Sequence, residues 1–389
     1  MGSTPGSERV IYTADAVYNG VGLPLAGAGV LVSSANTIVS FGKLEALKTQ
    51  FPDVPVQHLG QAILPAPVNA HTHLDMTRFA FAAAPYFDWI PKAVIANRDL
   101  RGLEGARLGL DQLIASGASA YGDIVAREPV MDFLLEQSLL GGVAHWEVIG
   151  SDPTRASQIL NDTRQKIASW RKLERSGGLR VGLSPHTTHT VSHELLRGLA
   201  QYARLEGLPP MQIHIAEHPS EPEWFRTGRG SLETMLAGIP GVPDATATLG
   251  RQPDPDLTPI KYLAELGVLD AKPTLIHMVN VTEEDVRIVA QFGCSVVTCP
   301  RSNRNLECGV FPWALYAKYG VEVGLGTDSV ASGETLDIRD EVRAALEVHP
   351  ALGLPTVLRW AVRGGYKALG MKTPVVARGD DFSKLTLWK

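Results

Sequence analysis

The chain has 389 residues, 44% of them hydrophobic and 20% charged, and its formal net charge is -5 at pH 7. This length exceeds that of a usual single domain, so we expect one large catalytic domain with an accessory piece. The net charge provides no broad basic surface, so we expect neither nucleic acid nor a membrane as a partner. Small neutral or anionic ligands remain open.

The hydrophobic residues are not gathered into membrane-spanning stretches. The longest apolar stretches, such as residues 21–33, are short and interrupted by Gly and Pro, and no signal-peptide pattern opens the chain. We therefore expect a cytoplasmic protein. Cys294, Cys299 and Cys308 are an odd number without CxxC spacing, which indicates buried or incidental thiols rather than disulfides or a thiolate zinc site.

The two ends of the chain have a strand-like pattern. Residues 9–60 contain short β-branched runs separated by glycines, and residues from about 374 to 388 again resemble a strand. We predict that the two ends pair in one sheet. The expected domains are a small β-domain from residues 1–60 plus 372–389, and a larger domain from residues 61–371.

Between residues 61 and 329, short apolar runs that end in polar or ionisable residues alternate with longer helix-like segments. The eight runs are 62–73, 118–126, 141–150, 179–187, 210–217, 273–280, 294–300 and 321–329. The helix-like segments with apolar residues at three- and four-residue steps are 106–115, 155–175, 193–205 and 283–292. Eight alternations predict an α/β fold with a TIM-like (β/α)8 barrel, whose catalytic residues lie at the C-terminal ends of its strands.

Residues 219–257 are rich in Gly, Pro and charge, and we expect them to form a long loop. Loops of that size in compact domains are more often functional than idle. The segment is therefore a candidate lid over the active site.

Histidines and a carboxylate stand at the ends of four predicted strands. His71 and His73 are two residues apart, so in a strand both side chains point to the same face, although such a pair alone is more often structural. The fifth, sixth and eighth runs contain His214, His277 and Asp328 near their ends. A barrel would gather these positions, and nitrogen and carboxylate donors with an open position suit a catalytic Zn²⁺ or Fe²⁺.

Six motifs at these strand ends carry a family resemblance. They are PVNAHTHLDMT, SPHTTHTVS, IHIAEHPSE, LIHMVNVT, CPRSNRNLECGVFP and GLGTDSVASGETLDIRDEV. Together they resemble the amidohydrolase superfamily, and within it the mononuclear purine and pyrimidine deaminase branch that includes the aminodeoxyfutalosine deaminases. The resemblance spans residues 60–370 approximately.

The resemblance implies a site for one divalent metal ion. Its ligands would be His71, His73, His214 and Asp328, with Zn expected first and Fe as the alternative. Binuclear members carry a carbamylated Lys after the fourth strand, where this sequence has His186. One ion is therefore expected.

The resemblance also implies catalytic roles. A divalent ion lowers the pKa of a bound water, and Asp328 would take the proton as the water attacks an aromatic carbon that bears an amino group. Glu217, in the HxxE arrangement with His214, would protonate the ring nitrogen and then the leaving ammonia. His277 would orient the attacking group. Taken singly, Glu217 could be a surface residue and His277 a core histidine.

Substrate contacts follow less directly from the motifs. His186 matches the family position that hydrogen-bonds the substrate, whereas His189 and Asn280 depart from the residues that relatives often carry there. Arg301 and Asn303 follow the seventh strand and could bind polar groups of the substrate. An equal alternative is that this short polar stretch caps a helix.

The expected reaction is the hydrolytic deamination of a small-molecule heterocycle, foremost 6-aminodeoxyfutalosine of menaquinone synthesis. That substrate carries a benzoate, for which Arg78, Arg301 or Arg304 could supply a cation. The alternatives are a guanine or cytosine deaminase, a triazine-type chlorohydrolase or a cyclic amidase, and, in a different class, an inactive barrel that acts as a binding protein. Many members of the family form homodimers, so we expect the same here.

Overall fold

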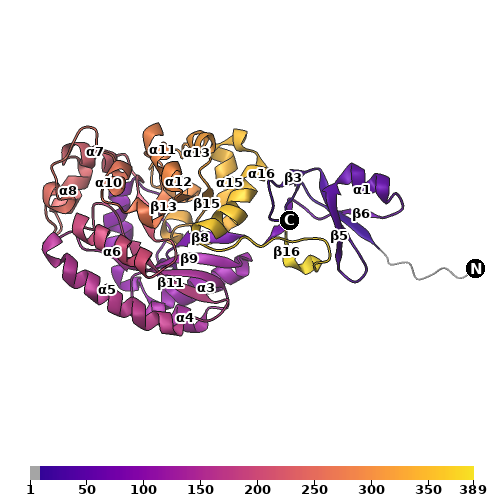
Figure 1. Ribbon diagram of the computed structural model, residues 1–389, viewed down its shortest axis with the longest axis horizontal. Helices are drawn as coiled ribbons and strands as arrows, with labels where there is room; N and C mark the ends of the chain where they lie inside the picture. The colour runs from indigo at the N-terminus through magenta and orange to yellow at the C-terminus, as the bar shows by residue number, and fades with distance from the viewer. Residues whose placement is uncertain (1–8) are drawn as a thin grey trace, which may run out of the picture.

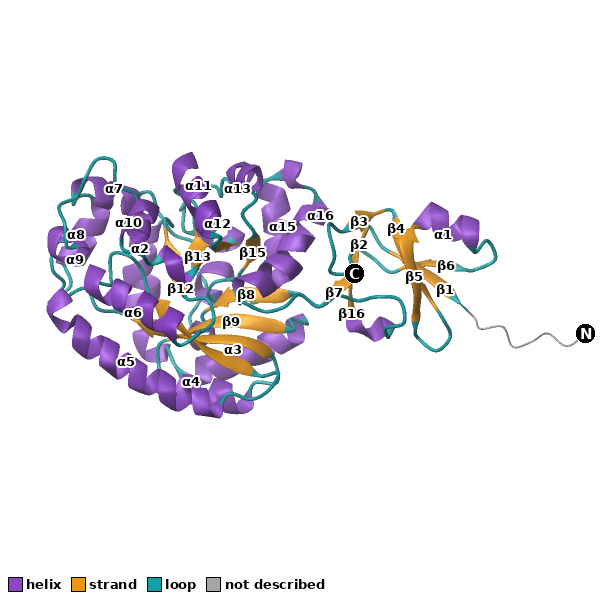
Figure 2. Cartoon of the chain, viewed as in Figure 1, coloured by secondary structure: helices purple, strands orange, loops and turns teal. Residues whose placement is uncertain are grey.

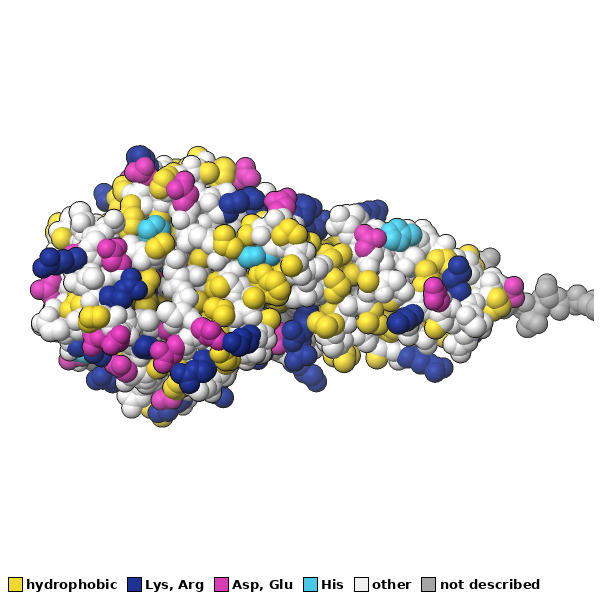
Figure 3. All heavy atoms as spheres, turned by 90° about the horizontal axis from the view of Figure 1, so that it is seen from above, with side chains coloured by type: hydrophobic (Ala, Val, Ile, Leu, Met, Phe, Trp, Pro, Cys, Tyr) yellow, Lys and Arg dark blue, Asp and Glu magenta, His cyan; other side chains and the backbone are white. Residues whose placement is uncertain are grey.

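The computed structural model describes residues 9–389. The strands from the two chain ends lie together beside a larger body of mixed helices and strands (Figures 1 and 2). Acidic and basic side chains are interspersed over the face seen in Figure 3. No helix found within residues 9–389 combines the length and the apolar character that a bilayer crossing requires.

Parallel strands form the centre of the larger body. Within residues 9–389 they make two four-stranded sheets, one of β8 (Val68–Thr72), β9 (Ala120–Val125), β10 (Gly141–Val148) and β11 (Leu179–Pro185), and one of β12 (Gln212–Ile215), β13 (Thr274–His277), β14 (Ser295–Thr298) and β15 (Val323–Leu325). Isolated parallel bridges between Thr72 and Asp328 and between Thr187 and His214 link the two sheets. The predicted α/β class is confirmed.

Helices follow the strands as the apolar periodicity predicts. The longer ones are α3 (Leu103–Ser116), α4 (Glu128–Gln137), α5 (Ala156–Trp170), α6 (His193–Leu205), α11 (Glu283–Phe292) and α15 (Ile338–Val348). The shorter ones include α10 (Pro259–Glu265), α12 (Pro300–Asn305), α13 (Trp313–Tyr319), α14 (Val330–Gly333), α16 (Leu354–Arg359) and α17 (Gly365–Ala368). The bounds predicted for α6 and α11 are confirmed, and α11 begins with a capping box between Thr282 and Asp285.

The first predicted strand run is wrong as a single strand. It divides into β7 (Ala62–Pro65) and β8, because Pro65 and Pro67 lack the N–H groups that a continuous ladder would need. β7 pairs with β16 (Leu385–Trp388) and with β2 (Ala16–Val17), whereas β8 pairs with β9. The site histidines therefore begin a separate strand.

The chain ends form two further four-stranded sheets within the described residues. One has the order β16-β7-β2-β3, with β3 at Leu25–Ala26, and the other has the order β5-β4-β1-β6. The strands of the second are β5 (Ile38–Lys43), β4 (Ala28–Val32), β1 (Val10–Thr13) and β6 (Val56–His58), with α1 (Leu44–Gln50) after β5. Val30, Ile63 and Phe382 share one apolar cluster, so residues from both ends of the chain pack together.

The segment 219–257, expected as a long loop, is instead largely helical. It contains α7 (Ser220–Thr227), α8 (Ser231–Ala237) and α9 (Ala245–Leu249). Trp224, Phe225 and Leu236 are buried in the main apolar core, so the segment is anchored by packing. The loop prediction is therefore wrong.

Candidate metal and catalytic site

A cavity of about 160 Å³ opens at the C-terminal ends of the parallel strands. The side chains lining its floor include His73, Glu147, His186, His214, Glu217, His277 and Asp328. Its lining also includes Tyr86 and Trp89 of α2 (Tyr86–Trp89) and Ile90 and Val94 of the following π-helical turn (Ile90–Ile95). Within residues 9–389, no residue of the segment 219–257 is among the side chains that line this cavity.

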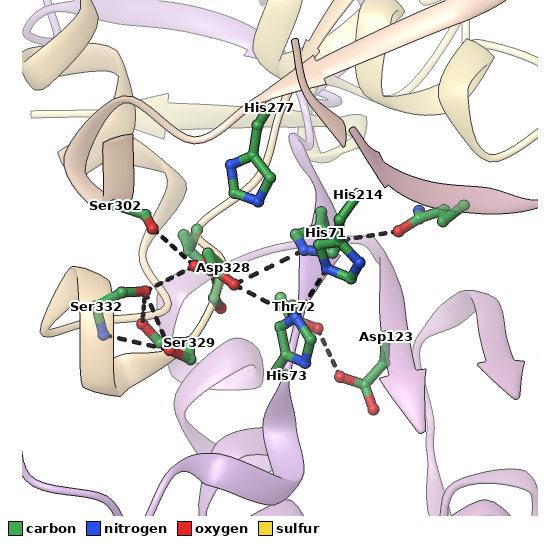
Figure 4. A network of polar contacts seen from close by, with 12 residues as sticks. His71, Thr72, His73, Asp123, His214, His277, Ser302, Asp328, Ser329 and Ser332 are labelled. Carbon is green, nitrogen blue, oxygen red and sulfur yellow. Dashed lines mark hydrogen bonds and ion pairs between the residues drawn. The ribbon is translucent and has the colours of Figure 1, made fainter. Parts of the chain in front are cut away.

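Three buried histidines converge at this floor (Figure 4). His71 lies in β8, His73 directly follows it, and His214 lies in β12. One nitrogen of each ring lies within 4.8 Å of the others, and His73 Nε2 is 3.3 Å from His214 Nε2. Facing imidazole nitrogens at this spacing can share one cation.

Asp328 adds a carboxylate to the histidine cluster. Its Oδ1 lies 3.4 Å from His73 Nε2 and 3.7 Å from His71 Nε2. Its Oδ2 accepts hydrogen bonds from Ser302 Oγ at 2.7 Å and from Ser332 Oγ at 2.8 Å. The two serines therefore hold one carboxylate oxygen, and the other faces the histidines.

Hydrogen bonds on the outer edge of two rings determine which nitrogen faces the centre. His71 Nδ1 donates to Gln212 Oε1 at 2.8 Å, and His214 Nδ1 donates to the carbonyl oxygen of His186 at 2.9 Å. Their Nε2 atoms are thus left as acceptors, which is the arrangement of metal-binding imidazoles. His71 Nε2 is buried and has no hydrogen-bond partner within residues 9–389, as expected of a ligand atom for a cation.

Burial favours the neutral form of His73 and His214, which is the form that metal ligands need. Burial lowers the pKa of His73 to about 3. Burial, with the neighbouring His71, also lowers the pKa of His214 well below its usual value. The chemistry of the donors, three imidazoles and one carboxylate, fits a divalent ion such as Zn²⁺ or Fe²⁺.

Glu217 lies against His277 at the edge of this cluster. Its Oε1 is 3.6 Å from His277 Nε2, and its side chain is 13% exposed. Burial, with the charge of Asp328, raises the pKa of Glu217 to about 8. The carboxyl group is therefore protonated at neutral pH and can donate a proton.

His277 is oriented by its backbone and by Asn303. It ends β13 with φ of 70°, and its Nδ1 donates to Asn303 Oδ1 at 3.0 Å. Ala216 and Asp328 also have positive φ, at 51° and 57°. Left-handed backbone is unfavourable for residues other than Gly, and its concentration at these strand ends indicates that the fold holds the site under local strain.

The structure brings some predicted substrate residues to the cavity and places another elsewhere. His186 lines the cavity, and Asn303 contacts His277. The Arg301 side chain is bound by Glu341 and by Thr335, and it lines a different surface cavity. This environment gives Arg301 a packing role instead of a place among the histidines.

The amidohydrolase family model matches residues 62–388. The chain belongs to the amidohydrolase family. This membership makes it a hydrolase, and the deaminases among its relatives indicate action on carbon–nitrogen bonds other than peptide bonds. The predicted family is therefore confirmed.

Relatives of this amidohydrolase include nucleoside deaminases. An aminodeoxyfutalosine deaminase of Deinococcus radiodurans is 49% identical over 381 residues, which cover 97% of this chain and 90% of the relative. A 5-methylthioadenosine/S-adenosylhomocysteine deaminase of Halobacterium salinarum is 31% identical over 375 residues, which cover 90% of this chain and 80% of the relative.

Solved structures share the fold of this amidohydrolase. Helicobacter pylori aminofutalosine deaminase, in complex with methylthio-coformycin, has a TM-score of 0.74 at 21% identity and covers 96% of this chain and 90% of that one. A zinc-bound adenosine deaminase from Xanthomonas campestris has a TM-score of 0.65 at 22% identity, and the match covers 96% of this chain and 83% of that one. The amidohydrolase fold of the TIM-barrel type is thus shown.

Sequence reasoning missed several residues around the amidohydrolase site. Gln212 and Ser332 contact predicted ligands, and Arg101 links Asp75 to Glu147 beside the cavity. Glu147 stands near the end of the third predicted strand, so the strand-end rule could have found it. Arg101 lies in no periodic run, and the sequence carries no comparable signal for it.

Proposed function

We propose that this amidohydrolase is a metal-dependent aminodeoxyfutalosine deaminase that hydrolyses the exocyclic amine and releases ammonia. The observation that carries the proposal is the buried Glu217 carboxyl group beside His277 at the histidine and aspartate cluster, where burial raises the pKa of Glu217 to about 8. An acid at that place can protonate a ring nitrogen of an aminated heterocycle. The identity to the Deinococcus radiodurans deaminase over nearly the whole chain supports this substrate.

We infer one divalent ion, with Zn²⁺ foremost and Fe²⁺ as the alternative, held by His71, His73, His214 and Asp328. The three converging imidazoles, the His71 Nε2 atom without a hydrogen-bond partner in the described residues, and the Oδ1 of Asp328 that faces them support this set. When bound, such an ion supplies an activated water at neutral pH.

The side chains divide the remaining proton transfers among themselves. Asp328 Oδ1 accepts the proton of the attacking water, because Oδ2 is occupied by the two serines. Glu217 donates to the ring nitrogen next to the attacked carbon. His277 Nε2 holds the attacking oxygen in line. As the carbon–nitrogen bond breaks, the proton taken up by Asp328 leaves with ammonia, and the second proton of the water passes from the new hydroxyl group to Glu217, which restores the acid.

We infer that the chain from β8 to residue 371 forms one (β/α)8 barrel and that residues 9–60 plus 372–389 form a small β-domain. β7 pairs with strands of this second unit, so the boundary lies after β7 and not at residue 61 as predicted, and residues 1–8 of the predicted domain lie outside the described residues. The bridges Thr72–Asp328 and Thr187–His214 support the barrel, and the sheet that contains β2, β7 and β16 supports the second unit. A cytoplasmic location and a homodimer remain predictions from the sequence. Light scattering on the purified chain would test the homodimer.

Ammonia release tests the proposed function. The purified, zinc-loaded chain is assayed with aminodeoxyfutalosine, 5′-methylthioadenosine, S-adenosylhomocysteine, adenosine, guanine and cytosine. We expect the highest kcat/KM with aminodeoxyfutalosine and inhibition by methylthio-coformycin. A higher kcat/KM with guanine or cytosine, or no ammonia release from any of the six compounds, would overturn the proposed substrate.

A further inference from the structure

Arg101 is a buried cation beside the catalytic cavity. It precedes α3, and its Nε lies 2.8 Å from Asp75 Oδ2 while its Nη1 lies 3.4 Å from Glu147 Oε2. Its Nη2 is buried and has no hydrogen-bond partner within residues 9–389. Two carboxylates therefore hold the guanidinium in place, and part of its donor capacity is unused.

Glu147 is a buried acceptor next to this cation. Its side chain is 5% exposed, and its Oε1 lies 4.0 Å from His186 Nε2. Burial alone would raise the pKa of Glu147, but Arg101 and His186 outweigh it and lower the pKa. Glu147 is therefore ionised, and both it and Arg101 line the cavity.

The contacts trace a path away from the reacting groups. The His214 ring lies 5.3 Å from the His186 ring, His186 contacts Glu147, and Glu147 contacts Arg101. A heterocycle that meets Glu217 and His186 would direct the group attached to it along this wall. In a nucleoside that group is the sugar.

The positive charge at the end of the path already has carboxylate partners within the protein. Arg101 carries one positive charge and faces the two carboxylates of Asp75 and Glu147. A substrate carboxylate there would meet Glu147 as a like charge. A hydroxyl group both donates and accepts, so it matches an ionised carboxylate beside a guanidinium.

We propose that Glu147 and Arg101 form the subsite that recognises the sugar hydroxyls of the nucleoside, with Glu147 accepting from them and Arg101 donating to them. This specificity role rests on the proposed function. It also means that Arg101 is not a free cation for the benzoate of aminodeoxyfutalosine.

Glu147→Gln tests the subsite with aminodeoxyfutalosine and its 2′,3′-dideoxy analogue. A hydrogen bond to a charged group contributes about 1.5–3 kcal/mol, so we expect the wild type to prefer the hydroxylated substrate by about 10- to 100-fold in kcat/KM. Glu147→Gln should abolish most of this preference. Its kcat/KM for the dideoxy analogue should stay close to that of the wild type. Equal losses on both substrates would overturn the proposal, because a merely structural role slows both.

Two further variants keep the test decisive. Glu136→Gln, on the exposed side of α4, should keep the wild-type preference. Arg101→Lys, which retains a cation, is assayed with aminodeoxyfutalosine and its benzoate methyl ester. One outcome would overturn the proposal: the wild type has a higher kcat/KM for the acid than for the ester, Arg101→Lys loses this difference, and Arg101→Lys keeps the preference for the hydroxylated substrate. That outcome would assign Arg101 to the substrate carboxylate.

Binding separates the two possible failures. If the wild type releases ammonia from no nucleoside, the proposed function fails, and calorimetric titration with inosine and 2′,3′-dideoxyinosine then judges the subsite alone. Tighter binding of inosine that disappears in Glu147→Gln supports the subsite. Equal binding of the two ligands by the wild type overturns it.

Discussion

Two walls of the same cavity each carry a buried glutamate, and the two carboxyl groups are in opposite states. Glu217 lies on the wall formed after β12 and β13, where its neighbours are His277 and Asp328, and burial raises its pKa to about 8. Glu147 lies on the wall formed by β10, where Arg101 contacts it and its pKa is lowered. Neighbouring charge, not residue type, decides the state.

This difference assigns different chemistry to identical side chains. A carboxyl group without a cation keeps its proton and can act as an acid, whereas one that faces a guanidinium stays an acceptor. Within residues 9–389, Arg101 is the one Lys or Arg side chain that lines this cavity. Its position therefore determines which wall donates and which wall accepts.

Removing the acid from the first wall should have the largest effect. Glu217→Gln keeps the shape of the side chain but has no acidic proton, so we expect kcat to fall by about 10²- to 10⁴-fold. Metal content measured by elemental analysis should stay at one ion per chain. Glu265→Gln, exposed on α10, is the matched control, and near-normal turnover of Glu217→Gln would remove Glu217 from its role.

Removing the cation from the second wall should lower the stability of the protein. Arg101→Met leaves Asp75 and Glu147 buried without their partner, and breaking a buried pair in this way costs about 3–5 kcal/mol of unfolding free energy. Urea unfolding followed by circular dichroism measures this cost. Arg101→Lys should lose less, and equal stability of Arg101→Met and the wild type would contradict the pairing.

The strand-end positions could be predicted from the sequence because each stands in a short apolar run with a recognisable motif. His71, His73, His214 and Asp328 meet through the general geometry of parallel strands, which requires no knowledge of individual contacts. The same rule applies to Glu147. The alternation of strands and helices could also be predicted, because it follows from the apolar pattern within each segment.

The contacts around these positions depend on packing between distant segments. Arg101 meets Asp75 across 26 residues, and Arg301 meets Glu341 across 40, so neither pairing has a periodic signal. The prediction of a loop at 219–257 is wrong because the Gly and Pro residues there separate short helices, and packing of the buried aromatic residues against the core stabilises these helices.

Removing the residue that orients His277 should have a smaller effect on the first wall. Asn303→Ala removes the acceptor that holds His277 Nδ1, and the loss of such an orienting partner reduces activity by about 10- to 100-fold. Because His277 acts on the attacking group, we expect kcat to fall and KM to stay within about threefold. A change confined to KM would instead place Asn303 at the substrate, as one of the sequence predictions has it.

The pH dependence distinguishes the two walls within one enzyme and should be the smallest effect near neutrality. Glu217 is protonated below its pKa of about 8, so the proton donor is present at pH 7 and is lost as the pH rises through 8. We expect kcat/KM to fall about tenfold per pH unit above that value. Glu147 is already ionised at neutral pH, because its pKa is lowered, and it adds no change over this range. A kcat/KM that stays constant from pH 7 to 10 would contradict the acid role of Glu217 and, with it, the contrast between the walls.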